Sequence, residues 1–199
     1  MTPVAGIDLV LASTSRYRRE LLARIAPAFR TIAPAVDETP RTGETPVALA
    51  CRLAEAKARA VAADCPGALV IGSDQVADLD GQPIGKPGTI AAARAQLGAA
   101  SGRVLVFHTA LCVVDTRSAT PRAHAECDTT RVAFRELSDD EIARYVAAEQ
   151  PLDCAGSFKA EGLGISLFER IDNSDPSALI GLPLIALARL LRAAGVALP

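Results

Sequence analysis

The sequence predicts one α/β domain with two lobes, spanning residues 1–199 as a single unit. Three observations support this fold class. Short apolar segments alternate with helix-like segments through the first half of the chain and again near its end. Two long β-like segments occupy the middle of the chain. No repeat, linker or low-complexity tract divides it, and its length suffices for one well-buried core.

The first half is expected to alternate between strands and helices. A short apolar run ends in Ser13-Thr14-Ser15, residue types that cap helix N-termini. Thr45-Pro46 begins a long Ala-rich helix, because proline suits the first helical turn. The expected elements are strands at 9–12, 29–33 and 68–72, a helix carrying Tyr17, Leu21, Leu22 and Ile25 on one side, and a helix from 45 to about 63.

The second half is expected to be richer in strands. Asp80-Gly81 is a tight-turn signal that predicts a short hairpin, and Ser138 to Glu141 form a capping box. Gly195 is suited to end the last helix. The expected elements are hairpin strands at 76–79 and 82–84, a helix at 89–99, β segments at 104–114 and 124–134, a helix from 138 to about 149, a strand-like 165–171 and a helix at 183–194.

Composition and charge exclude several classes of protein. Alanine accounts for 39 residues, tryptophan is absent and aromatic residues make up 4%, so we expect an aliphatic core. The net charge of −2 provides no field that recruits nucleic acid or an anionic membrane. The longest apolar run, 176–188, is too short to span a bilayer. We expect neither a nucleic-acid nor a membrane partner.

The cysteines favour a reducing compartment. Cys51, Cys65, Cys112, Cys127 and Cys154 are odd in number and widely spaced, and no C-x-x-C pair exists. Neither a zinc ribbon nor a thioredoxin-like redox site is indicated. The first residues lack a basic segment and an uninterrupted apolar run, so no signal peptide is expected. Reduced thiols in the cytoplasm are the simplest interpretation.

The first strand–loop–helix unit has the features of an anion site. Ser13-Thr14-Ser15 precede a helix whose first turn carries Arg16, Arg18 and Arg19. Free N–H groups at a helix N-terminus attract anions, and arginine donates two hydrogen bonds at once to phosphate. The alternative is an ordinary capped helix with a solvated basic first turn.

Acidic residues stand where strands are expected to end. Asp37-Glu38 and Asp74 follow apolar runs, and ligands of open α/β sheets gather beyond the carboxyl ends of strands. Carboxylates there suit Mg²⁺ or Mn²⁺, or the activation of water. Asp37-Glu38 fit a simple turn equally well. Lys57 on the long helix is by default a solvated surface lysine.

Three apparent motifs do not hold. Residues 81–86 have one residue too few between their glycines for a P-loop, and Pro87 replaces the Mg²⁺-binding hydroxyl; Lys86 still fits a phosphate contact. His124 and Glu126 form H-x-E without the P-C-x-x-C half of a deaminase site. Residues 161–164 lack the third glycine of a dinucleotide fingerprint.

Six ordered motifs together carry a resemblance. They are Leu11-Ala-Ser-Thr-Ser-Arg-Tyr-Arg-Arg19, Val36-Asp-Glu38, Ile71-Gly-Ser-Asp-Gln-Val76, Gly85-Lys-Pro87, Cys154-Ala-Gly-Ser-Phe-Lys-Ala-Glu-Gly162 and Gly181-Leu-Pro-Leu-Ile185. From Leu11 to about Leu191 the chain resembles the Maf family of nucleotide pyrophosphatases. Gly-Ser-Asp-Gln and Cys-Ala-Gly-Ser-Phe-Lys match the subgroup that acts on 7-methyl-GTP. Arg16 stands where the family often has proline.

This resemblance implies a two-lobed fold similar to inosine triphosphate pyrophosphatases, with a long, mixed, twisted sheet behind a central cleft. It implies hydrolysis of 7-methyl-GTP to 7-methyl-GMP and pyrophosphate, a divalent cation, and a homodimer. The implied site consists of Asp74 as general base or metal ligand, Glu38 as metal ligand, phosphate contacts at Ser13, Arg18, Lys57 and Lys86, and base selection at Tyr17, Gln75 and Glu161.

Two other functions stay open at this point. One keeps the reaction but assigns dTTP, UTP or another modified nucleotide as the substrate. The other is a nucleotide-binding regulator of septum formation, an association that the family's name carries. Asp74, Glu38, Lys57 and Lys86 favour catalysis over binding alone, because they supply a base and cations for phosphoryl chemistry.

Overall fold

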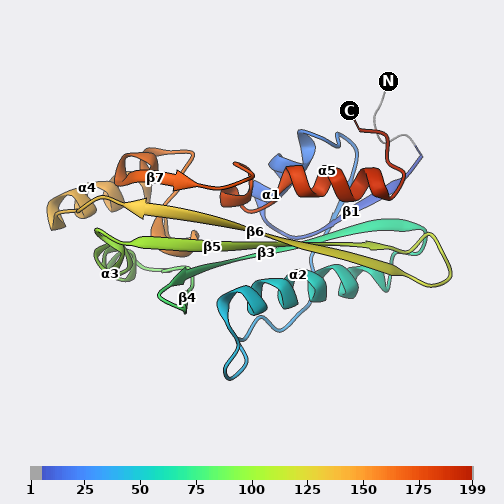
Figure 1. The fold of residues 1–199 in the computed structure, drawn as a ribbon, viewed down its shortest axis with the longest axis horizontal. Coiled ribbons are helices and arrows are strands. Elements are labelled where there is room, and N and C mark those ends of the chain that lie inside the picture. Colours follow the sequence, from blue (N-terminus) through green and yellow to red (C-terminus); the bar gives the residue numbers. More distant parts are fainter. Residues whose placement is uncertain (1–5, 199) are drawn as a thin grey trace.

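The computed structural model describes residues 6–198 as one seven-stranded sheet with helices on both faces (Figure 1). The strand order is β2-β1-β3-β5-β6-β7, and β4 pairs with one end of β3. The strands are β1 (Asp8–Ala12), β2 (Arg30–Ile32), β3 (Ala68–Leu79), β4 (Gln82–Ile84), β5 (Val104–Asp115), β6 (Arg122–Phe134) and β7 (Phe168–Asp172). The helices are α1 (Arg16–Ala23), α2 (Pro46–Ala62), α3 (Ile90–Ala100), α4 (Asp139–Glu149) and α5 (Leu184–Ala193), with short 3₁₀ turns η1 (Ala155–Ser157), η2 (Leu163–Leu167) and η3 (Ala178–Ile180).

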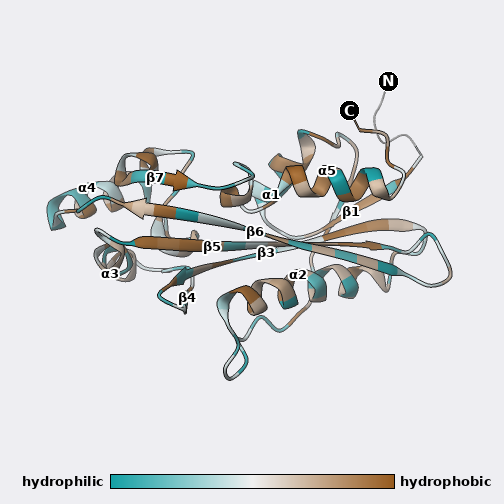
Figure 2. Cartoon of the chain, in the orientation of Figure 1, coloured by the Kyte–Doolittle hydropathy of each residue, from teal (hydrophilic) through white to brown (hydrophobic). Residues whose placement is uncertain are grey.

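The sheet is mixed, as expected. β1 lies parallel to β2 and β3, whereas β3, β5, β6 and β7 form antiparallel neighbours. The long strands β3, β5 and β6 run through both ends of the molecule, so the two lobes share one sheet (Figure 1). Figure 2 shows hydrophobic residues concentrated along β3 and β5, while α4 is largely hydrophilic.

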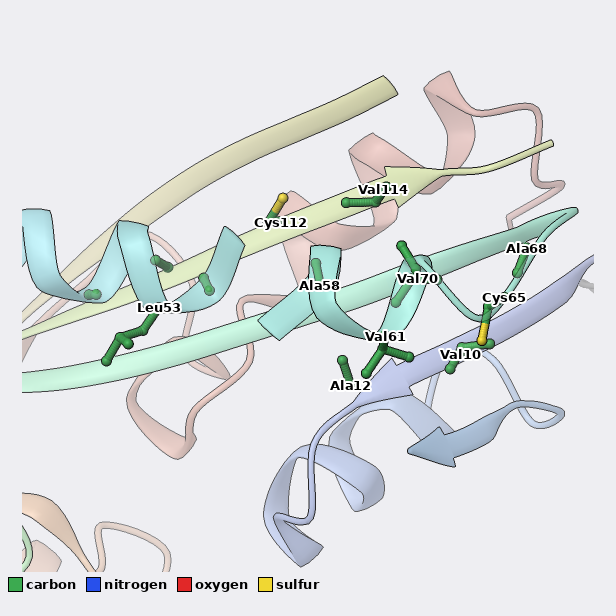
Figure 3. Close-up of a cluster of buried hydrophobic side chains, with 14 of the residues drawn as sticks. Val10, Ala12, Leu53, Ala58, Val61, Cys65, Ala68, Val70, Cys112 and Val114 are labelled. Atoms are coloured by element: carbon green, nitrogen blue, oxygen red, sulfur yellow. The ribbon is translucent and has the colours of Figure 1, made fainter. Parts of the chain in front are cut away.

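The first lobe has an aliphatic core on each face of the sheet. On one face, α2 packs against β1, β3 and β5; Figure 3 shows Leu53, Ala58 and Val61 of this helix among the strand residues. On the other face, α1 and α5 cover the same strands through Leu21, Leu22, Leu187 and Leu191. These clusters confirm the expected aliphatic core for this lobe.

In the second lobe, where α3 and α4 pack at the other end of the sheet, the expectation of an aliphatic core is wrong. The core of this lobe contains Phe107, Phe134, Phe158 and Phe168, whose ring centroids lie 4.8–5.6 Å apart in edge-to-face contacts. Edge-to-face packing is the favourable arrangement of aromatic quadrupoles. A low aromatic content did not exclude an aromatic cluster, because most phenylalanines of the chain gather in this one place.

The first helix, α1, ends at Ala23, so Ile25, which was assigned to it, lies beyond its end. The other expected elements are confirmed with two exceptions. The third strand does not end at residue 72 but continues to Leu79, and residues 165–167 form part of η2 rather than a strand. Glu149 explains the second difference, because its carboxylate accepts a hydrogen bond from the Leu163 N–H at 2.9 Å and caps this turn from α4. Within residues 6–198, no helix is both long and apolar enough to cross a membrane.

Candidate active site

A gap in the sheet creates the main cleft. On one side, β3 pairs with β1 over residues 68–71 and with β4 over 77–79, whereas residues 72–76 have no strand neighbour there in the described chain. β5 covers the other side throughout. A cleft of about 840 Å³ opens at this gap, and Asp74 is among the residues that line it. Asp74 therefore stands in mid-strand, which corrects the expectation that it follows a strand end.

The backbone of β3 also faces this gap. Asp80-Gly81 join β3 to β4 as a two-residue turn with positive φ angles of 52° and 81°, so the flanking pair Leu79–Gln82 exchanges hydrogen bonds. Bonding direction alternates along an antiparallel strand. Ser73 and Gln75, in phase with Leu79, therefore direct their N–H and C=O groups into the gap, where they are available to a ligand.

Asp74 forms a buried ion pair with Lys57. The Lys57 Nζ lies 2.6 Å from Asp74 Oδ1 and 2.8 Å from Glu38 Oε1. The Lys57 side chain is 7% exposed and that of Asp74 is 9% exposed, whereas Glu38 is 60% exposed. Lys57 is thus not the solvated surface lysine that its helix position suggested by default. A buried ammonium needs such partners, since an unpaired buried charge is strongly destabilising.

Gly72 brings Lys57 close to Asp74. A Cβ at this position would lie 2.3 Å from the Ala54 carbonyl oxygen and 2.6 Å from the Ala58 nitrogen. The absence of a side chain therefore lets α2 approach β3 closely on the face that carries Asp74. The glycine before Ser73-Asp74 marks this helix contact rather than the end of the strand.

Burial and the nearby cations have opposite effects on the pKa of Asp74. Burial raises the pKa of Asp74 above its ordinary value, while Lys57 and then Arg18 oppose that rise. Only Oδ1 accepts a hydrogen bond from a described residue. The second carboxylate oxygen is thus free to accept a proton from a water molecule in the cleft.

The β1–α1 loop places hydroxyl and guanidinium groups at the cleft, and such groups suit a phosphate. Ser15 caps α1 by accepting a 3.4 Å hydrogen bond from the Arg18 N–H, and Ser13 accepts one from the Ser15 N–H at 3.1 Å. Arg18 Nε donates to the Gly181 carbonyl at 2.8 Å, which anchors its side chain beside the cleft. Burial lowers the pKa of Arg18, but an arginine stays cationic.

Lys86 reaches the cleft from the other lobe. It follows β4 on the Gly85–Pro87 segment and is exposed. Gln96 of α3 holds this segment by donating to the Gly85 carbonyl at 3.1 Å. The cleft therefore has cationic side chains on both walls, an arrangement suited to a polyphosphate.

The three residues implied in base selection also line the cleft, with different environments. Tyr17 carries the guanidinium of Arg16 at 4.7 Å from its ring centroid, and its hydroxyl accepts from Arg16 at 2.7 Å. Glu161 is exposed at the cleft wall. Gln75 points to the sheet face opposite Asp74, where its amide lies 2.9–3.0 Å from Thr109 Oγ1 and the Ala178 and Leu179 carbonyls.

The structure adds groups that sequence reasoning missed. Ser73 Oγ lies 2.8 Å from the Ala110 carbonyl and 3.0 Å from that of Gly181, and Thr109 Oγ1 donates to the Ala178 carbonyl at 3.0 Å. Together with Gln75 they fasten segment 178–181 over the sheet. Gly181 begins the Gly181–Ile185 motif, but nothing in the local sequence indicates that its carbonyl positions Arg18.

The donor chemistry of the cleft fits Mg²⁺ or Mn²⁺. Asp74 and Glu38 supply two carboxylates that share one Lys57 ammonium, and Mg²⁺ is commonly held by one or two carboxylates with substrate phosphates and water. Within residues 6–198, no group of three or more His, Cys, Asp or Glu side chains forms a metal cluster. A cation here would thus need the oxygens of a bound nucleotide.

The chain belongs to the Maf family: the family model described as Maf-like protein matches residues 8–194. Curated relatives carry the name 7-methyl-GTP pyrophosphatase. One from Xanthomonas oryzae pv. oryzae is 61% identical over 96% of this chain and 98% of its own length. Those from Aromatoleum aromaticum and Albidiferax ferrireducens are 59% and 56% identical, covering 96% and 94% of this chain and 97% and 94% of their own lengths. The family resemblance and the two-lobed α/β fold are thereby confirmed.

Proposed function

We propose that this protein hydrolyses 7-methyl-GTP to 7-methyl-GMP and pyrophosphate. The observation that carries the proposal is the buried Asp74–Lys57 pair at the gap in β3, inside a cleft with cations on both walls. The near full-length similarity to relatives named 7-methyl-GTP pyrophosphatase supports the choice of substrate. All the residues assigned to the site from the sequence line this one cleft.

In the proposed reaction, Asp74 accepts a proton from water, and the resulting oxygen nucleophile attacks the α-phosphorus. The bond from the α-phosphorus to the oxygen that bridges it to the β-phosphorus breaks, and pyrophosphate leaves. Arg18 and Lys86 offset the negative charge on the phosphates from opposite walls, with Ser13 donating from the β1–α1 loop. Lys57 keeps Asp74 ionised and contacts phosphate oxygen beside it.

Asp74 and Glu38 are proposed to hold the divalent cation together with the nucleotide. When bound, such a cation polarises a phosphoryl oxygen. We expect chelation to abolish pyrophosphate release and added Mg²⁺ or Mn²⁺ to restore it. Glu38→Gln should raise the metal concentration needed for half-maximal rate by about tenfold, because one anionic ligand is lost. An unchanged metal requirement in this variant would remove Glu38 from the cation site.

We also propose that the enzyme works in the cytoplasm as a homodimer. The free thiols suit a reducing compartment, since all five cysteines are unpaired in the structure. Every residue assigned to the reaction comes from one copy of the chain.

A direct test compares pyrophosphate release from 7-methyl-GTP, GTP, dTTP and UTP at equal concentrations with Mg²⁺ or Mn²⁺. Preference for 7-methyl-GTP is the expected result. Preference for dTTP or UTP would keep the Asp74 chemistry and overturn the substrate. Tight binding of nucleotide without any turnover would instead indicate the regulator of septum formation.

Tyr17→Leu tests how the base is selected. N7-methylation gives guanine a positive charge, which an aromatic face attracts by about 0.5–2 kcal/mol, or roughly 2- to 30-fold. We expect kcat/KM for 7-methyl-GTP to fall by more than that for GTP. Arg16→Ala is the matched variant, because it frees the Tyr17 ring from a competing cation and should raise the preference for 7-methyl-GTP. Equal losses on both nucleotides in Tyr17→Leu would argue against selection through ring charge.

A further inference from the structure

β6 presents a long unpaired edge. β5 covers one side of this strand along its whole length, but β7 covers the other side only from Arg131 onward. Residues 122–130 have no strand neighbour on that side among residues 6–198. Figure 1 shows β7 beside one end of β6 only, and Figure 2 shows hydrophilic segments recurring along β6. Exposed strand edges are templates for pairing with another strand.

Two hydrogen bonds at the end of β6 show which of its residues direct their N–H and C=O groups to the free edge. The Phe134 N–H donates to the Arg103 carbonyl on the β5 side at 2.9 Å, and the Arg135 N–H donates to the Leu167 carbonyl on the opposite side at 3.1 Å. The β5–β6 register is continuous back to Arg122. Because bonding direction alternates, odd-numbered residues such as Ala123, Ala125 and Cys127 direct their N–H and C=O groups to the free edge.

We propose that two copies of this chain pair through this edge as antiparallel strands, with Ala125 on the two-fold axis. In a symmetric antiparallel pair with exchanged hydrogen bonds at its centre, the self-paired residue must be one of the odd-numbered positions. Centring the pair on Ala125 places Arg122 opposite Asp128 of the second copy, and His124 opposite Glu126 of the second copy. This interface specifies the homodimer proposed above and is independent of the reaction.

Neighbouring registers are disfavoured by charge and by space. An axis at Cys127 would place Glu126 opposite Asp128 of the second copy, which is a like-charge pair. An axis at Ala123 would place Arg122 opposite His124 and would extend past the start of β6. The pairing centred on Ala125 uses residues 122–128 only and leaves residues 129–130 as clearance before β7.

Asp128 is the acidic residue that this register places opposite Arg122 of the second copy. One of its oxygens accepts from Ser174 Oγ at 2.6 Å, while Oδ1 is buried without a hydrogen-bond partner. Within the described chain Asp128 belongs to no ion pair, and neither does the exposed Arg122. Asp128 lines a second, smaller cleft of about 250 Å³, together with Glu126, Asp175 and Arg189. Arg189 pairs with Glu126, so Asp128 is left without a cation of its own among residues 6–198. In the proposed register, Arg122 of the second copy brings a cation to Asp128.

The first experiment is sedimentation equilibrium of the full chain over a range of concentrations, where we expect a dimer. Ala125→Pro removes an N–H that points to the free edge, so the β5 ladder keeps its bonds and the variant should be a folded monomer. Ala125→Thr keeps that N–H and should remain a dimer. Turnover of 7-methyl-GTP by the Ala125→Pro monomer should persist, which separates this surface from the proposed reaction.

The second experiment tests the register. Ala125→Cys combined with Cys127→Ser should give a cross-linked dimer with oxidised glutathione, because paired Cα atoms about 5.5 Å apart suit a disulfide. A monomer at every concentration would overturn both the homodimer and this interface. A dimer that survives Ala125→Pro would overturn the interface alone. Cross-linking through native Cys127 without cross-linking at position 125 would overturn the register.

Discussion

Asp74→Asn should lower the rate of pyrophosphate release from 7-methyl-GTP by about 10³-fold or more. A positioned general base contributes about 10²–10⁴-fold, and the same substitution also removes an anionic ligand from the proposed cation site. Asparagine keeps the shape of the side chain but neither accepts the water proton nor carries a charge. The measurement is the single-turnover rate with saturating Mg²⁺ or Mn²⁺.

The fold should tolerate this change. Lys57 keeps Glu38 as a partner at 2.8 Å, and removal of a carboxylate whose pKa is raised by burial relieves a desolvation cost. Cooperative thermal unfolding of the variant would confirm an intact structure. Asp78→Asn is the matched control on the same strand, since Asp78 lies outside the cleft beside His108. Full activity of Asp74→Asn would remove both the base and the metal-ligand assignments.

The order of elements was predictable because local patterns and tertiary packing agree along most of the chain. The apolar runs, the Asp80-Gly81 turn and the Ser138 capping box each specify their element locally, and all three are present. The predicted end of β3 at residue 72 is wrong, because a glycine such as Gly72 is typical of a strand end. Its actual role is to admit the α2 backbone, and that contact joins residues distant in the chain.

Some features of the candidate site could be predicted from the sequence and others could not. The sequence does contain an indication that Lys57 is buried: it occupies the same helical stripe as Ala50, Leu53, Ala54 and Val61, all of which are buried. A charge on an apolar stripe needs a buried partner. The internal bonds of Gln75 have no such indication, because Thr109 lies on another strand and the two carbonyl acceptors lie more than a hundred residues away in segment 178–181.

The gap in the sheet explains why residues from so many segments meet at one place. β1 and β4 flank the same side of β3, and the β1–α1 loop and the Lys86 segment extend from the two ends of the gap. α2 closes one face beside Asp74, and segment 178–181 closes the other. None of these neighbours is visible from a single motif, although each motif lies in one of them.

Lys57→Met should move the acid limb of the pH–rate profile to higher pH. Burial already raises the pKa of Asp74, and Lys57 is the largest opposing influence, so removing its ammonium raises that pKa further. Turnover needs the ionised carboxylate, and below the new pKa the rate falls about tenfold per pH unit. Loss of this cation beside the phosphates adds a decrease of about 10²-fold near neutral pH.

The higher pKa of Asp74 in Lys57→Met should also make the stability of this variant depend on pH. A folded-state pKa above the ordinary value of 3.8 means that the favourable contribution of protonated Asp74 is complete below that pH and is lost as the pH rises through the folded-state pKa. Lys57→Met should therefore unfold at a lower temperature near neutral pH than in acid, relative to the unmodified protein. Arg59→Met is the matched control, because Arg59 lies two residues further along α2 in an exposed pair with Glu55. If Lys57→Met is slower but the acid limb of its pH–rate profile does not move, Lys57 acts on the phosphates only and does not lower the pKa of Asp74.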